Sequence, residues 1–149
     1  MNIQIYTCLF DSSSYYKSGR KEYEKRLSRY CKIKHTICKN EKQKEKVRLL
    51  LSQLPEEQRK NGLIWVTAGK SKSHLDSPGL ASLIEQKGIQ GISSLCFLVG
   101  FPEDFFSDFD NSLPLSISRM DIHPDLLSLI LEEQIYRAYR IIRKEPYHK

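Results

Sequence analysis

GLIWVTA, at residues 62–68, is a short and almost unbroken apolar run that begins at a glycine. SSLCFLVG, at residues 93–100, is a second run of the same kind, and it stops at Gly100. Continuous apolar runs are typical of strands in parallel sheets, because helices cover both faces of such sheets. The two segments therefore predict strands buried inside a layered α/β fold.

Segments of helical and strand character alternate outward from these two runs. Strands are predicted at 2–9, 31–38, 62–68, 93–100 and 111–118, and helices at 14–29, 41–53, 77–87 and 124–143. In the first helix, Tyr15, Tyr23, Leu27 and the following Tyr30 are predicted to face the core, with the Lys and Arg side chains facing solvent. The alternation favours a mainly parallel sheet in a single domain that spans residues 1–149.

Loops that follow parallel strands are the expected place for a ligand, because helix starts and strand ends meet there. Three loops occupy such positions, namely AGKSKS (68–73), GFPEDF (100–105) and SRMDIHP (118–124).

Charge is unevenly distributed along the chain, whose net charge is +6. Residues 17–48 hold 13 Lys and Arg against 4 Asp and Glu, whereas residues 101–133 hold 1 against 8. Residues 134–149 are basic again. A surface for a polyanion such as RNA and a merely solvated basic face are both compatible with this pattern.

Several classes of protein lack support in the sequence. No apolar run approaches the roughly 20 residues that cross a bilayer, and MNIQIYTCLF is predicted to be a strand, not a signal peptide. A cytoplasmic protein without membrane association is expected. The four cysteines form no C-x-x-C pair, and no metal-binding, P-loop, dinucleotide or serine-hydrolase motif occurs, so no metal is expected.

The C-terminal half carries more specific patterns. LCFLVGFPEDF (95–105) is followed by LPLSIS (113–118), EQIYRA (133–138) and PYH (146–148). These segments resemble the RlmH family of ribosomal large-subunit methyltransferases, in which a hydrophobic strand ends in Gly-Gly-Pro. In that family an LSLS-x-LTLPH segment follows, and the chain closes with EQ-hydrophobic-YRA and PYH.

The resemblance implies a SPOUT-type α/β fold whose C-terminal part forms a trefoil knot. It further implies a homodimer that uses S-adenosylmethionine to methylate N3 of pseudouridine 1915 of 23S rRNA on assembled ribosomes. Carried over by position, the cofactor contacts are Trp65, Gly100, Phe101, Ser118, Arg119, Met120, Asp121, Ile122 and His123. The indole of Trp65 is expected either to stack on the adenine or to fill the core.

Two positions differ from the family pattern. Phe101 replaces the second glycine of Gly-Gly-Pro, and His123 precedes Pro124 where the family has proline before histidine. Both positions lie in the expected cofactor pocket. The alternative hypothesis is therefore a dimeric RNA- or ribosome-binding protein of the same fold that has lost methyl transfer.

The C-terminal tail is expected at the mouth of the pocket. Tyr147 would stack on a base and His148 would accept a proton from N3. Three arginines on the last helix, Arg137, Arg140 and Arg143, would contact phosphates. Alternatively, Tyr147 and His148 only cover a hydrophobic seam.

Other polar residues are expected to have simpler roles. His35 and His74 are predicted at the surface, and the acids between 103 and 125 on a mostly solvated face. His123 is expected either to bind the cofactor or only to cap the last helix. The apolar arc of that helix, which includes Ile130 and Leu131, is wider than one stripe and predicts an obligate homodimer. Each tail is expected to complete or flank a site near the knot of the partner chain.

Overall fold

The computed structural model describes residues 1–10, 15–69, 73–109 and 111–147. Five strands form one sheet in the order β2-β1-β4-β3-β5, and every neighbouring pair is parallel. The strands are β1 (Asn2–Cys8), β2 (Lys32–Cys38), β3 (Leu63–Ala68), β4 (Ser94–Val99) and β5 (Leu113–Ser118). The predicted α/β class and parallel sheet are therefore confirmed.

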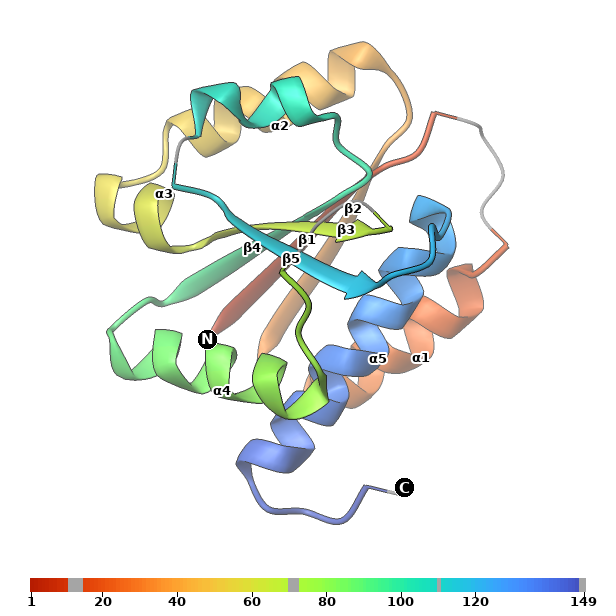
Figure 1. The fold of residues 1–149 in the computed structure, drawn as a ribbon, viewed down its shortest axis with the longest axis vertical. Helices are drawn as coiled ribbons and strands as arrows, with labels where there is room; N and C mark the ends of the chain where they lie inside the picture. Colours follow the sequence, from red (N-terminus) through yellow and green to blue (C-terminus); the bar gives the residue numbers. More distant parts are fainter. Residues whose placement is uncertain (11–14, 70–72, 110, 148–149) are drawn as a thin grey trace.

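Helices cover both faces of the sheet, as Figure 1 shows. The helices are α1 (Lys17–Leu27), α2 (Glu41–Ser52), α3 (Glu56–Asn61), α4 (Ser77–Ile89), the 3-10 helix η1 (Glu103–Asp108) and α5 (Pro124–Ile142). α1, α4 and α5 lie over one face, and α2 and α3 lie over the other. Among the described helices, none is both long and apolar enough to span a membrane.

Each face of the sheet has its own core because successive strand residues point to opposite sides. Phe97 of β4 packs with Leu27 of α1 and Leu131 of α5. Its neighbour Leu98 packs on the other face with Leu51 of α2 and Phe105 of η1. Burial of one such side chain stabilises a fold by about 1.5–3 kcal/mol, so the two cores hold the helices firmly against the sheet.

The first helix differs from its prediction at two positions. Tyr15 lies before α1 and is 82% exposed, so its predicted inward orientation is wrong. Arg20, predicted to face solvent, is buried, and its Nη1 lies 2.5 Å from Oδ1 of Asp125. Arg20 shares the inward face of α1 with Tyr23 and Leu27, three and seven residues later, and Asp125 matches its charge there.

β5 makes hydrogen bonds along both of its edges. One edge pairs with β3. On the other edge, the amide of Ser116 donates to the carbonyl of Ser73 at 2.8 Å, and the amide of Leu75 donates to the carbonyl of Ser116 at 3.3 Å. The chain around β5 thus lies between two earlier segments, which agrees with the knot that the resemblance implies.

Candidate functional site

A cavity of about 820 Å³ opens beyond the carboxyl ends of β3 and β4. Its walls come from β3, the segment after β4, β5 and the start of α5. The lining residues are Trp65, Val66, Thr67, Ala68, Gly100, Phe101, Pro102, Glu103, Pro114, Asp121, Ile122, His123, Pro124 and Leu127. This size and position are typical of ligand sites in open α/β sheets.

Two glycines allow the loops around this cavity to approach each other closely. Gly100 has φ +77°, and a Cβ there would lie 2.7 Å from the carbonyl oxygen of Cys8 and 2.9 Å from Cβ of Pro124. Gly69 has φ +79°, and a Cβ there would lie 3.0 Å from Cα of Asp121. Only glycine adopts this backbone without strain, so the shape of the cavity depends on both residues.

Six of the nine expected cofactor contacts line the cavity. They are Trp65, Gly100, Phe101, Asp121, Ile122 and His123. The other three, Ser118, Arg119 and Met120, form the turn that leads into it. Oγ of Ser118 accepts a hydrogen bond from the amide of Met120 at 2.9 Å, and the side chain of Met120 is 77% exposed.

Trp65 and Phe101 both belong to the core as well as to the cavity wall. The indole of Trp65 stacks on the ring of Phe106 with centroids 4.5 Å apart. Phe101 is buried, and its ring lies 4.5 Å from that of Phe105. The core beneath the cavity therefore accommodates the side chain that replaces the family's second glycine.

Thr67 was not among the predicted site residues. It lies near the carboxyl end of β3 and lines the cavity, and its buried Oγ1 has no hydrogen-bond partner among the described residues. A buried hydroxyl without a partner is costly, so this atom is suited to receive a polar group of a ligand. Its position at the end of a buried strand is the one signal that the sequence offers.

His123 lies where the cavity meets a second hollow of about 460 Å³. The second hollow shares four residues with the cavity, namely Gly100, Pro102, His123 and Pro124. His123 is also the N-cap of α5, and its Nδ1 accepts from the amide of Asp125 at 3.4 Å. It therefore both caps the helix and borders the cavity.

In this chain the tail folds back on α5. The hydroxyl of Tyr147 donates to Oε1 of Glu133 at 3.0 Å, and its ring meets that of Tyr136 edge-on, with centroids 5.2 Å apart. Glu133 lies about 14 Å further along the helix axis than Pro124. Tyr147 is thus away from the cavity of its own chain, and His148 lies outside the described residues.

The environment of Tyr147 also defines its chemistry. Partial burial and the hydrogen bond to Glu133 raise the pKa of its hydroxyl above the ordinary value. Tyr147 therefore remains a protonated phenol near neutral pH, which can donate a hydrogen bond or stack but does not act as a base.

The three predicted RNA-binding arginines contact groups of their own chain. Arg137 pairs with Glu133 at 2.7 Å. Arg140 pairs with Glu145 at 3.1 Å and donates to the carbonyl of Pro146. The guanidinium of Arg143 lies 4.7 Å from the ring centroid of Tyr30. In this chain the first two hold the tail against α5, and the third packs against Tyr30.

A second polar centre is buried between α1, β2 and α5. Nδ1 of His35 lies 2.7 Å from Oε1 of Glu132, and its Nε2 lies 2.7 Å from Oγ1 of Thr7. The side chains of His35 and Glu132 are 4% and 0% exposed. The predicted surface position of His35 is therefore wrong, as is a solvated position for Asp125, which is buried beside Arg20.

Burial has opposite effects on the two partners of this centre. It lowers the pKa of His35 to about 4 and raises the pKa of Glu132 to about 8. Both side chains are consequently neutral near pH 7, because the interior disfavours either charge.

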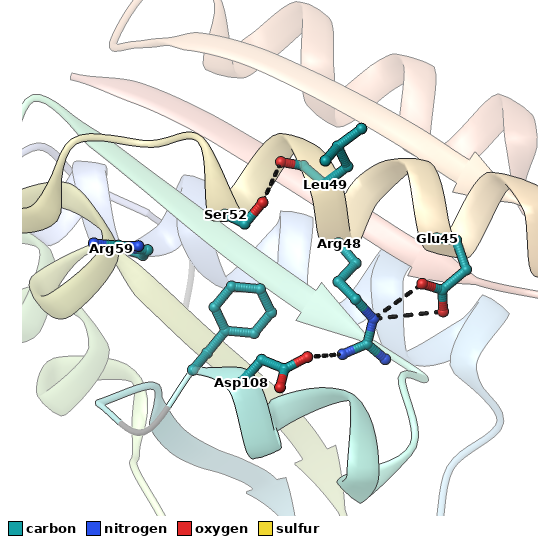
Figure 2. A pocket seen from close by; sticks show the side chains of 7 residues that line it. Glu45, Arg48, Leu49, Ser52, Arg59 and Asp108 are labelled. Atoms are coloured by element: carbon teal, nitrogen blue, oxygen red, sulfur yellow. Dashed lines mark hydrogen bonds and ion pairs between the residues drawn. The ribbon is translucent and has the colours of Figure 1, made fainter.

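A further hollow lies between α2, α3 and the segment around η1. Figure 2 shows Arg48 reaching from α2 toward two carboxylates. Its Nη1 lies 2.6 Å from Oδ2 of Asp108, and its Nε lies 3.2 Å from Oε2 of Glu45. Because Arg48 is already paired with Glu45 and Asp108, it is not available to bind a ligand. The cavity beyond β3 and β4 is therefore the better candidate for a ligand site.

Comparison with known proteins identifies relatives over the whole chain. Residues 1–148 match the family described as "Predicted SPOUT methyltransferase". Relatives named ribosomal RNA large subunit methyltransferase H are 34% identical in Clostridioides difficile and in Shouchella clausii, and 35% identical in Bacillus pumilus. Each alignment covers 100% of this chain and 100% of the relative.

Proposed function

Because the chain belongs to the SPOUT methyltransferase family, we propose that it transfers a methyl group from S-adenosylmethionine to large-subunit ribosomal RNA. The names of its full-length relatives support this class of substrate. We assign N3 of a pseudouridine in 23S rRNA as the acceptor, at position 1915, on assembled ribosomes in the cytoplasm. The observation that carries the proposal is the cavity at the carboxyl edge of the sheet, where Gly69 and Gly100 allow the surrounding loops to approach each other closely.

The residues of the cavity fit S-adenosylmethionine in three respects. The indole of Trp65 offers a flat apolar surface to an adenine, and the unpartnered hydroxyl of Thr67 offers a hydrogen bond. Asp121 supplies a negative charge that suits a cationic ligand. When bound, the cofactor would supply a methyl group that needs no further activation.

The work of the chain is then to position the acceptor and remove its proton. An imide N3–H is a poor nucleophile until the proton leaves. A methyl acceptor must lie beside the donor, and the hollow that adjoins the cavity at His123 provides such a space. We assign His148 as the proton acceptor, because imidazole titrates near neutrality. Tyr147 would stack on the base as a neutral phenol.

A second copy of the chain explains how the tail could reach a cavity. Tyr147 folds back on α5 and does not line the cavity of its own chain. We therefore propose a homodimer in which the tail of one chain completes the site of the other. The apolar side chains of Leu126, Leu129 and Ile130 on α5 are only partly buried and suit the interface, whereas Leu131 is fully buried in its own core.

Basic side chains would hold the RNA through its phosphates. α1 exposes Lys21 and Lys25, and β2 exposes Lys32 and Lys34. Arg137, Arg140 and Arg143 would add contacts beside the tail. Binding should weaken steeply as salt concentration rises, because each neutralised phosphate releases counterions.

The test combines cofactor binding with turnover. Calorimetry should detect S-adenosylmethionine at micromolar concentration, and the purified chain should methylate ribosomes from a strain that lacks its gene. Mass spectrometry of the 23S rRNA would identify the modified nucleotide. Ribosome binding without cofactor binding or methylation would instead favour the non-catalytic RNA-binding alternative.

A further inference from the structure

Three potential metal ligands from three different elements meet in the polar centre between α1, β2 and α5. Glu24 comes from α1, His35 from β2 and Glu132 from α5. One ligand atom of each lies within 4.8 Å of the others. The centre lies on the opposite side of β1 from β4 and β3, and its residues do not line the cofactor cavity.

The hydrogen bonds of this centre leave one oxygen unmatched. Oε1 of Glu132 contacts His35, whereas its buried Oε2 has no hydrogen-bond partner within the described part of the chain. The carboxylate of Glu24 approaches the same group, with its Oε1 4.0 Å from Nδ1 of His35. Two carboxylates this close together repel each other unless a proton or a cation lies between them.

The nearest cation is already matched by another acid. Nη1 of Arg20 lies 2.5 Å from Oδ1 of Asp125, and Oδ2 of Asp125 accepts from the amide of Tyr15 at 3.1 Å. Arg20 and Asp125 thus form a pair beside the centre. Glu24 and Glu132 are therefore two acids that share one imidazole, and they share the charge of Arg20 with Asp125.

We propose that Glu24, His35 and Glu132 bind a divalent transition-metal ion, for which zinc is the best match. Zinc accepts imidazole nitrogen and carboxylate oxygen together, whereas magnesium and calcium prefer oxygen alone. Ligand atoms about 2.0–2.2 Å from zinc lie somewhat more than 3 Å apart in a tetrahedron. Nδ1 of His35 and Oε1 of Glu132, now 2.7 Å apart, would therefore separate slightly around the ion, and Glu24 can move toward it because its side chain is 34% exposed.

Thr7 supports His35 from the far side of the ring. Oγ1 of Thr7 lies 2.7 Å from Nε2, so an Nε2–H can donate to it while Nδ1 faces the two carboxylates. Metal-binding histidines commonly have such a partner on the second nitrogen. The partial exposure of Glu24 provides an entry path and leaves room for a water ligand. The bound ion would link α1, the edge strand β2 and α5.

Equilibrium dialysis of the full chain against zinc tests the site without cofactor or ribosomes. We expect one zinc ion per chain and a raised melting temperature. Glu24→Gln and Glu132→Gln should each weaken binding by about a hundredfold or more, and Thr7→Val by about tenfold or more. Glu22→Gln is the matched control, since it removes the same charge from the exposed part of α1 and should bind zinc like the wild type.

Folding of each variant is checked first by circular dichroism, and Glu24→Gln decides the result if Glu132→Gln fails to fold. Cobalt-substituted protein should lack a thiolate charge-transfer band, because no cysteine is a ligand. Absence of binding at micromolar zinc would overturn the proposal and leave a shared proton as the occupant. Equal zinc binding by Glu24→Gln and Glu22→Gln would also overturn it. Either failure would leave the proposed methyl transfer unaffected.

Discussion

The two ends of α5 contribute to the molecule in different ways. At its N-terminal end, Pro124 and Leu127 border the cavity, and Gly100 packs against Pro124 so closely that a Cβ has no room. At its C-terminal end, the tail rests on side chains of its own helix through Tyr147, Glu133 and Arg137. Close contacts of the main chain therefore shape the N-terminal end of α5, whereas side-chain contacts hold the tail at its C-terminal end.

This difference indicates which part of the site one chain can complete alone. Main-chain contacts at Gly100 and Gly69 fix the cavity whether or not a partner is present. The contacts of Tyr147 are one hydrogen bond and ring contacts at a partly exposed position, and such contacts are weak enough to be exchanged for others. The cavity is therefore preformed, and the proposed use of the tail depends on a second chain.

His148→Ala, in the C-terminal tail, should have the largest effect of these variants, and the quantity affected is the rate of methyl transfer. We expect methyl transfer to fall about a hundredfold or more, because a positioned proton acceptor is lost. Cofactor affinity should stay unchanged, since the described residues that line the cofactor cavity include none of the tail. Single-turnover rates on unmodified ribosomes and calorimetry measure the two effects, and an unchanged rate would reduce His148 to a packing role.

Mixed dimers can show whether the tail crosses between chains. One chain carries His148→Ala, and the other carries Asp121→Lys, which places a like charge beside the cationic cofactor. If each tail serves the partner's cavity, one intact site remains and about half of the activity is retained. If each tail serves its own cavity, the mixed dimer is inactive.

Gly100→Ala should have the next largest effect, on stability and cofactor binding. Gly100 follows β4 and packs against Pro124 at the N-terminal end of α5. Its φ of +77° strains any side chain, and the new Cβ would meet the carbonyl of Cys8 at 2.7 Å. We expect a loss of about 2–4 kcal/mol in unfolding free energy and weaker cofactor binding. Gly91→Ala is the control, because φ there is +84° with nothing within 4 Å, and it should cost only about 1–2 kcal/mol. Urea unfolding of both variants measures the difference, and equal losses would contradict the close contact.

The free energy of unfolding should depend on pH because Glu132, in the middle of α5, and its neighbour His35 have shifted pKa values. The folded chain holds a proton on Glu132 up to about pH 8, which the unfolded chain releases near 4.5, so stability is lost as pH rises toward 8. His35 has the opposite effect between pH 6.5 and about 4, where the unfolded chain binds the additional proton. The two effects oppose each other below pH 6.5.

A net loss of about 2 kcal/mol is therefore expected between pH 6.5 and 8. Urea unfolding in the presence of a chelator measures it, and Glu132→Gln should remove this alkaline loss. An alkaline decline of the same size in the Gln variant would show that other groups cause it.

Thr67→Val should give the smallest change, with opposite signs for stability and binding. Removing the unpartnered hydroxyl should leave stability unchanged or raise it by about 1 kcal/mol, while cofactor affinity falls about fivefold. Thr7→Val is the contrasting variant, because Thr7 has a partner in His35. It should lower stability by about 1–2 kcal/mol and leave cofactor affinity intact. Thermal unfolding and calorimetry separate the two variants, and a destabilised Thr67→Val chain would indicate a partner for that hydroxyl.

Elements that depend on extended apolar burial were predictable from the sequence. The strands expected at 62–68 and 93–100 are β3 (Leu63–Ala68) and β4 (Ser94–Val99), because residues buried on both faces must be apolar throughout. α3 and η1 were missed. Both are short, and α3 buries none of its residues, so neither has a helical apolar pattern to recognise.

Side-chain clusters assembled from distant elements were not predictable. The site loops could be placed, because strand ends of a parallel sheet must meet at one edge. By contrast, Glu24, His35 and Glu132 have no characteristic spacing, and only the packing of α1 and α5 beside β2 brings them together.

Glu132 and Glu133 show where local sequence stops being informative. They are adjacent and chemically identical, so the sequence alone determined only that two acids lie in the last helix. Each helical residue turns about 100° from the one before it. In the folded chain one glutamate is therefore buried against His35, and the other is partly exposed and pairs with Arg137 and Tyr147. Their different environments, and hence their different chemistry, were decided by which face of α5 packs on the sheet.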